Sequence, residues 1–114
     1  MIRAQIIAAP IVAALVVATA TPALAAEPNG EALFTRECAI CHLKGGTGSL
    51  MLSRRLGEDS AILADRRNLT TAYVKRIVRY GVNSMPRFTR AELPNADLDA
   101  IAAYLARNSA PPAP

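Results

Sequence analysis

The chain has 114 residues, 13 Lys and Arg against 9 Asp and Glu, and a formal net charge of +4. This length indicates one domain, and so mild a positive charge, with no recognisable nucleic-acid-binding motif, argues against a nucleic-acid partner. The sequence has no Trp, two Phe and three Tyr. A domain this small and this poor in aromatic residues is short of apolar core, and a metal, a disulfide or a cofactor often completes such a core.

Residues 1–25 are typical of a secretory signal peptide. Arg3 supplies a positive charge, an apolar run occupies residues 11–18, and Ala23-Leu24-Ala25 has the small residues that signal peptidase requires. Cleavage is expected after Ala25, with Ala26 as the alternative. The apolar run is short for a membrane span of about 20 residues, and no second apolar span follows it. We therefore expect export to the periplasm, without stable membrane insertion.

The domain itself is expected over residues 26–108, and its pattern is helical throughout. Asn29 is a good cap for a first helix that runs to about Ala39. Helical spacing places four residues along one face of this helix and its continuation, which are Leu33, Phe34, Cys38 and Cys41.

This first helix leads into Cys38-Ala39-Ile40-Cys41-His42, the most informative segment of the chain. Two thiols three positions apart, followed by an imidazole, form the attachment pattern of a c-type haem. The thiols lie about one helical turn apart and can add to the two vinyl groups of the macrocycle. His42 can then serve as an axial ligand of the iron.

Other chemistries fit the same five residues less well. A structural zinc site needs four ligands, and this chain has two Cys and one His in total. A thioredoxin-like pair would follow a strand in a βαβ pattern, and no strand pattern lies nearby. The remaining alternative is a Cys38–Cys41 disulfide in an exported domain, with His42 at the surface.

Residues 43–58 have the composition of a loop, because three Gly fall within residues 44–49 and Gly57 closes the segment. A short helix is predicted over residues 60–66. Thr70 is expected to cap a further helix over residues 71–80 that ends at Gly81. The apolar face of that helix consists of Tyr73, Val74, Ile77 and Val78.

A loop containing Met85-Pro86 follows that helix. An iron held by His42 needs a second axial ligand or an open face, and His42 is the only His of the chain. Met51 is too close to His42 in sequence to reach the opposite face of a haem. Met85 lies 43 residues after His42, in a loop that Pro86 stiffens. We therefore predict Met85 as the sixth ligand, against the alternative that it fills the core.

The last elements are short except for one helix. Residues 89–92 have capping-box spacing, but Pro94 limits them to about one turn. Asn95 is expected to cap a final helix to about Arg107, with inward residues Leu98, Ile101, Ala102 and Leu105. Residues 109–114 form a Pro-rich tail that we expect to be disordered.

Together these features resemble a monohaem class I cytochrome c of the small bacterial periplasmic type. Gly30, Phe34 and Cys38 recur every four residues before the haem motif, and Met85-Pro86 lies where that family places its sixth ligand. The resemblance covers residues 29–108. It implies an all-α fold of about four to five helices wrapped around one covalent haem c. Its first and last helices would cross at Gly30, beside Phe34 and Tyr104.

One departure concerns the second ring nitrogen of His42. In the family a Pro about ten residues after the haem His lies beside the carbonyl that accepts the Nδ1 proton. No Pro lies between His42 and Pro86. A backbone carbonyl near Leu50 or Met51 is the replacement we expect.

The resemblance also assigns roles to polar residues. Asn83, Arg54 and Arg55 are candidate contacts of the haem propionates, and each is equally consistent with a solvated surface position. A larger basic set comprises Lys75, Arg76 and Arg79 on one helix face, with Arg66, Arg67, Arg87 and Arg90 nearby in sequence. This set is either a solvated face or a basic rim that steers an acidic redox partner to the haem edge.

Ligation of iron on both faces leaves no position for a substrate, which favours a one-electron carrier over an enzyme. The resemblance implies electrons taken from a periplasmic dehydrogenase of the flavin- or quinone-cofactor type and passed to a respiratory acceptor, and the protein could be a subunit of such a dehydrogenase. Two alternatives stay open. One is a haem c protein with a labile sixth ligand that acts as a peroxidase or gas sensor. The other is a haem-free exported helical binding domain with a disulfide.

Overall fold

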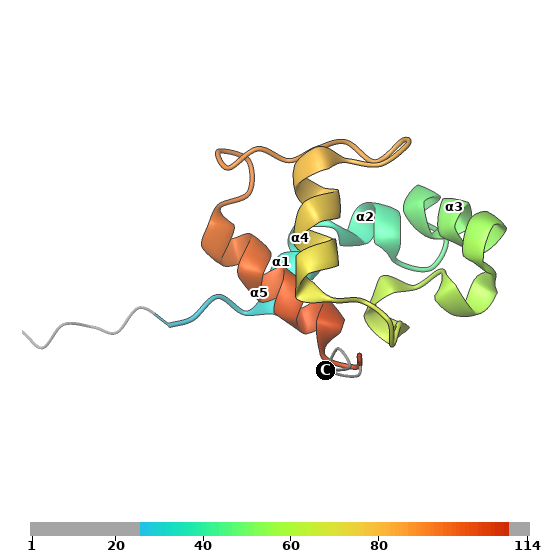
Figure 1. The fold of residues 1–114 in the computed structure, drawn as a ribbon, viewed down its shortest axis with the longest axis horizontal. Coiled ribbons are helices and arrows are strands. Elements are labelled where there is room, and N and C mark those ends of the chain that lie inside the picture. The colour runs from blue at the N-terminus through green and yellow to red at the C-terminus, as the bar shows by residue number, and fades with distance from the viewer. Residues whose placement is uncertain (1–25, 110–114) are drawn as a thin grey trace, which may run out of the picture.

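The computed structural model describes residues 26–109, which form an all-α domain without a strand in that range (Figure 1). This confirms the predicted fold class. The expected signal peptide and residues 110–114 of the expected tail lie outside the described residues. The helices are α1 (Gly30–Glu37), α2 (Ala39–His42), α3 (Thr47–Leu56), α4 (Thr71–Tyr80) and α5 (Asn95–Ala106), and two short 3₁₀ turns, η1 (Glu58–Ser60) and η2 (Leu63–Asp65), connect α3 to α4.

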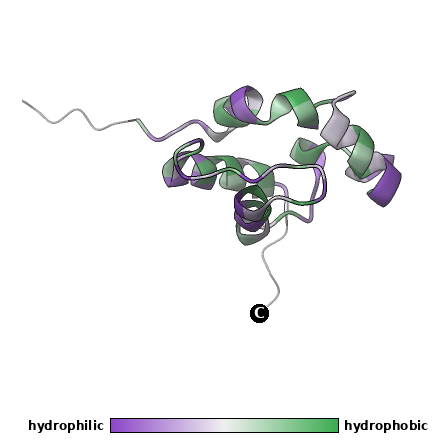
Figure 2. Cartoon of the chain, turned by 90° about the horizontal axis from the view of Figure 1, so that it is seen from above, coloured by the Kyte–Doolittle hydropathy of each residue, from purple (hydrophilic) through white to green (hydrophobic). Residues whose placement is uncertain are grey.

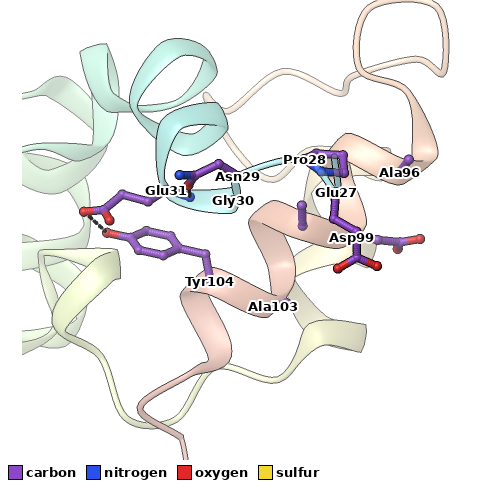
Figure 3. Close-up of a pocket in the computed structure, with 10 residues that line it drawn as sticks. Glu27, Pro28, Asn29, Gly30, Glu31, Ala96, Asp99, Ala103 and Tyr104 are labelled. Atoms are coloured by element: carbon purple, nitrogen blue, oxygen red, sulfur yellow. Dashed lines mark hydrogen bonds between the residues drawn. The ribbon is translucent and has the colours of Figure 1, made fainter. Parts of the chain in front are cut away.

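Helices α1 and α5 cross in direct contact at Gly30, as expected from the sequence. A Cβ added to Gly30 would overlap the carbonyl oxygen of Ala100 and would lie 2.9 Å from the Cβ of Tyr104. The ring centroids of Phe34 and Tyr104 lie 5.8 Å apart. The Tyr104 hydroxyl donates a hydrogen bond of 3.4 Å to Glu31, which ties the two helices together at their crossing (Figure 3).

A single apolar core joins α1, α4 and α5. Figure 2 shows apolar and polar residues sharing the same helices, the pattern of amphipathic helices that bury one face. No helix within residues 26–109 is both long and apolar enough to cross a bilayer. The buried apolar residues of this core are Leu33, Phe34, Leu69, Val74, Val78, Leu93, Leu98, Ile101, Ala102 and Leu105.

The predicted start of α1 and the predicted start and end of α4 are confirmed by their caps. The Asn29 side chain accepts hydrogen bonds of 3.1 and 3.2 Å from two amides in the first turn of α1. The Thr70 hydroxyl accepts one of 3.1 Å from the Tyr73 amide. Gly81 ends α4 with a φ of 73°, a conformation that Gly adopts without steric strain.

Two predictions between α1 and α4 are wrong. Residues 43–58 are not a loop throughout, because α3 occupies most of them. The run from Leu50 to Leu56 is rich in Leu, Met and Arg, which favour a helix and outweigh Gly48. The predicted helix over residues 60–66 is replaced by the separate 3₁₀ turns η1 and η2.

Two helix boundaries also differ from prediction. Helix α1 ends at Glu37, because Cys38 leaves helical geometry with a φ of −123°. Pro94, not Asn95, precedes α5, and Asn95 makes no cap bond. The Asn95 side chain instead accepts a hydrogen bond of 2.8 Å from Arg79 on α4. The four residues predicted to point inward from α5 are all buried.

The contact at Gly30 generates the first prediction. Gly30→Ala should destabilise the purified protein by about 2 kcal/mol through overpacking, although Ala favours a helix over Gly by about 1 kcal/mol. Ala32→Val, at an exposed position of the same helix, should change stability by less than about 0.5 kcal/mol. Chemical unfolding of the three proteins measures both effects. Equal stability of Gly30→Ala and the wild type would contradict a close crossing.

Candidate functional site

Cys38 and Cys41 lie on one helical turn that follows α1. The amide of Cys38 donates to the Phe34 carbonyl at 2.9 Å, and the Cys38 carbonyl accepts from the amides of Cys41 and His42 at 3.2 and 3.1 Å. Both cysteines are free thiols, Cys38 half-buried and Cys41 exposed. Burial, followed by the nearby charge of Glu37, raises the pKa of the Cys38 thiol to about 11.

His42 ends α2 and packs its ring against the start of α3. A Cβ added to Gly48 would lie 2.8 Å from Cε1 and 3.0 Å from Nδ1 of His42. A Cβ on Gly46 would lie 2.5 Å from the Cys41 carbonyl oxygen. These two glycines therefore let the chain pass closely over the motif, which gives the glycine-rich segment 45–48 a packing role that sequence reasoning did not assign.

The two ring nitrogens of His42 are consequently inequivalent. Nδ1 is buried and has no hydrogen-bond partner within the described residues. Burial lowers the pKa of His42, which favours the neutral imidazole that metals bind. With Nδ1 enclosed by the chain, Nε2 is the nitrogen available to a metal.

The carbonyl expected to accept from Nδ1 is not found near Leu50 or Met51. Both residues belong to α3, and the Leu50 carbonyl accepts instead from the Ser53 hydroxyl at 3.0 Å. The expectation failed because it assumed a loop at these positions, and backbone carbonyls inside a helix point along its axis toward later residues.

Met85 lies in a tight turn after α4, which we call the Met85 loop (residues 81–88). Val82 and Met85 exchange backbone hydrogen bonds of 3.1 and 2.9 Å, and Asn83 between them has a φ of 50°. A Cβ on Gly81 would lie 2.7 Å from the Met85 carbonyl oxygen. The backbone that carries Met85 is therefore held in one conformation by its own hydrogen bonds.

Met85 and Cys38 pack against the same core, although 47 positions separate them in the sequence. Met85 is half-buried, as is His42. The fold thus brings Cys38 of the predicted attachment turn and Met85, the predicted second ligand, to the same core from segments far apart in the sequence.

The candidate propionate contacts are not joined to this set. Arg54 and Arg55 lie in the last turn of α3, and Asn83 lies in the Met85 loop. All three are exposed. Their side chains make no hydrogen bond to another residue within 26–109.

Much of the basic set predicted from the sequence lines one open groove of about 600 Å³. This basic groove lies between α4 and the segment after Met85, and no acidic residue lines it. Three of its cations are already engaged. Lys75 pairs with Asp99 at 2.6 Å, Arg76 lies 5.5 Å from the centre of the Tyr80 ring, and Arg79 donates four hydrogen bonds. The lining residues are Lys75, Arg76, Arg79, Tyr80, Arg87, Phe88, Thr89 and Arg90.

A second open groove, of about 610 Å³, lies at the crossing of α1 and α5 (Figure 3). Its walls carry Glu27, Glu31 and Asp99 beside the small side chains of α5. None of Cys38, Cys41, His42 and Met85 lines it, so this groove is separate from the candidate site.

The donor set fits a covalently attached haem. The free thiols of Cys38 and Cys41 lie one helical turn apart. The chain encloses Nδ1 of His42 and leaves Nε2 as the free ring nitrogen. The Met85 thioether lies on a hydrogen-bonded turn against the same core as Cys38. Large apolar side chains are exposed on and just after α2, on α3, on α4 and in the Met85 loop. They are Ile40, Leu43, Leu50, Met51, Leu56, Tyr73, Tyr80 and Val82.

Sequence comparisons agree with this chemistry. Residues 25–105 match a family model described as cytochrome c oxidase, cbb3-type, subunit III. Cytochrome c6 of Bumilleriopsis filiformis is 35% identical over 81 residues, which cover 71% of this chain and 90% of that protein. Cytochrome c6 of Cyanidioschyzon merolae is 36% identical over 77 residues, or 68% of this chain and 69% of that one. Cytochrome c6 of Alaria esculenta is 32% identical over 81 residues, with coverages of 71% and 90%.

Proposed function

The chain belongs to the monohaem class I cytochromes c, and we propose that it carries single electrons from a periplasmic dehydrogenase to a respiratory acceptor. It holds one covalent haem c and is a small electron carrier, not an enzyme. Membership of this family removes the haem-free binding domain from consideration.

We assign the attachment of the haem to Cys38 and Cys41 and the axial positions to His42 and Met85. The observation that carries this assignment is the placement of Cys38 and Met85 against one core, with Nδ1 of His42 turned into the chain. The bound haem supplies an iron that changes between Fe(II) and Fe(III). With His42 and Met85 as its two ligands, the iron would have no position open to a substrate.

The protein side chains set the balance between the two iron states. The soft thioether of Met85 favours Fe(II) and raises the potential relative to a second imidazole. Half-burial of His42 and Met85 excludes water from the ligands, and a low dielectric favours the iron state of lower net charge. Asn83, Arg54 and Arg55 are exposed and polar. We assign them as contacts of the haem propionates, at the solvent-exposed edge of the haem.

The cellular setting of the proposal rests on the sequence. Residues 1–25 have the charge, apolar run and small residues of a signal peptide, which supports cleavage near Ala25 and function in the periplasm. A periplasmic carrier needs a donor, and a dehydrogenase with a flavin or quinone cofactor can release electrons one at a time. The acceptor is then a component of a respiratory chain.

The basic groove is the surface we assign to a redox partner with acidic side chains. Arg87 and Arg90 follow Met85 directly, are exposed, and make no salt bridge within residues 26–109. Both side chains therefore reach solvent beside the segment that carries the proposed ligand. Hydrogen bonds from Thr89, helped by the nearby charge of Arg87, lower the pKa of the Glu92 carboxyl. A net positive field at this position would steer an anionic partner toward the iron.

Covalent attachment is tested by intact mass. The exported protein should have the mass of the chain from about residue 26 plus one haem. The Cys38→Ser/Cys41→Ser double variant should carry no haem that survives extraction into acidified organic solvent. A mass equal to the processed chain less two hydrogens would indicate a disulfide and would contradict the assignment.

Axial ligation is tested by Met85→Ala with Met51→Ala as its matched control. The oxidised wild type should show a methionine-to-iron charge-transfer band, which Met85→Ala should lose and Met51→Ala should keep. The potential of Met85→Ala should fall, because the ligand that favours Fe(II) is gone. Persistence of the band in Met85→Ala would exclude Met85 as the ligand.

The role of the basic groove is tested with small oxidants of opposite charge. Arg87→Glu/Arg90→Glu should slow oxidation of the reduced protein by hexacyanoferrate(III) by about tenfold at low salt and should speed oxidation by a cationic cobalt complex. Both effects should shrink as salt is added. Arg36→Glu on α1, outside the groove, should change both rates much less. Equal effects at the two positions would mean that only net charge matters.

A further inference from the structure

The Arg79 guanidinium makes an unusual number of hydrogen bonds to the segment after the Met85 loop. One terminal nitrogen donates to the carbonyls of Phe88 and Thr89, both at 3.1 Å. The other donates to the Leu93 carbonyl at 2.9 Å and to the Asn95 side chain at 2.8 Å. Arg79, near the end of α4, thus contacts four groups along residues 88–95, the stretch that leads into α5.

This segment has little other attachment to α4. Residues 86–94 form no helix or strand. Within residues 26–109, the one backbone hydrogen bond between this segment and α4 runs from the Phe88 amide to the Val78 carbonyl, at 2.8 Å. The side chains of Thr89 and Glu92 bond within the segment, to each other and to each other's amides, in a capping box. Arg79 therefore provides most of the polar contacts that hold the segment against the helix.

The geometry of the contact requires arginine. Its planar guanidinium carries five N–H donors in a fixed fork, and it can reach several carbonyls at once. A lysine ammonium at the same position keeps the charge but is a compact point donor. Arg79 was placed in the basic set by sequence, yet its donors are directed at the protein itself.

The Arg79 contacts bear on Met85 through Phe88. Phe88 lies three residues after Met85, and both side chains pack against the core. The Val82–Met85 bonds fix the incoming side of the Met85 loop, while Arg79 and the Phe88 amide fix the outgoing side. Loss of the Arg79 bonds would release the outgoing side and let the Met85 thioether move away from the core.

We propose that Arg79 is a positioning residue that keeps Met85 on the haem iron, an inference that rests on the proposed axial role of Met85. Oxidised iron is the harder state and binds thioether less well than nitrogen donors, so loosening of the loop is most visible there. An added neutral ligand must displace Met85 to bind. Its apparent affinity therefore reports how firmly the loop holds the thioether.

Imidazole binding to the oxidised holoprotein, followed by visible spectroscopy, tests the proposal. Arg79→Gln should bind imidazole at least about tenfold more tightly than the wild type, and Asn95→Ala, which removes one of the four bonds, about threefold more tightly. Arg79→Lys should remain close to Arg79→Gln, because the donor fork and not the charge is required. Arg36→Gln removes a charge from α1, outside the basic groove, and should leave imidazole affinity unchanged.

The outcomes separate the two proposals. Wild-type affinity in Arg79→Gln and Asn95→Ala, or full rescue by Arg79→Lys, would overturn the role of Arg79. A charge-transfer band that persists in Met85→Ala would instead overturn the axial role of Met85. If Arg79→Gln does not yield folded protein, Asn95→Ala and Arg79→Lys decide alone. The reduction potential provides a second readout, and it should fall in Arg79→Gln because the Met85 contact is weakened.

Discussion

The crossing of α1 and α5 at Gly30 is the contact on which the rest of the domain depends. Because Gly30 has no side chain, the backbone of α1 touches the Ala100 carbonyl and the Tyr104 Cβ. That approach sets the direction of α1, and the end of α1 sets the position of Cys38. Leu33 and Phe34 reach the core beside α5. The proposed attachment residues Cys38 and Cys41 are therefore located by a helix contact that contains no residue of the proposed site.

The two halves of the site are held in different ways. The turn from Cys38 to His42 is local, with backbone bonds between residues three and four apart. Met85 belongs to a loop that is held differently on its two sides. Before Met85, backbone hydrogen bonds between Val82 and Met85 form a turn. After Met85, the Arg79 side chain donates to backbone carbonyls. The proposed axial ligand Met85 thus lies in a part of the chain whose position depends on the hydrogen bonds of one long side chain, Arg79.

Features that are local in sequence were predictable, and features that join distant segments were not. Asn29, Thr70 and Gly81 act at their own helix ends, so their residue types were sufficient. Helix α3 was missed because Gly46 and Gly48 at its start resemble a loop, although Gly46 packs on the Cys41 carbonyl and Gly48 on the His42 ring. Asn95 has a cap residue's chemistry, but Arg79, sixteen positions earlier, takes its side chain. No periodicity in the sequence reports such a pairing.

The distance along the chain between α1 and α5 has a consequence for the order of events in biosynthesis. Some seventy positions separate Gly30 from Ala100, and contacts of such long range form late, after the entropy of closing the loop between them has been overcome. Until α5 is present, α1 has no partner helix across Gly30, and Leu33 and Phe34 lack the α5 side of their core. The turn from Cys38 to His42 is held by bonds between residues three and four apart, so we expect it to form before the core that backs it is complete.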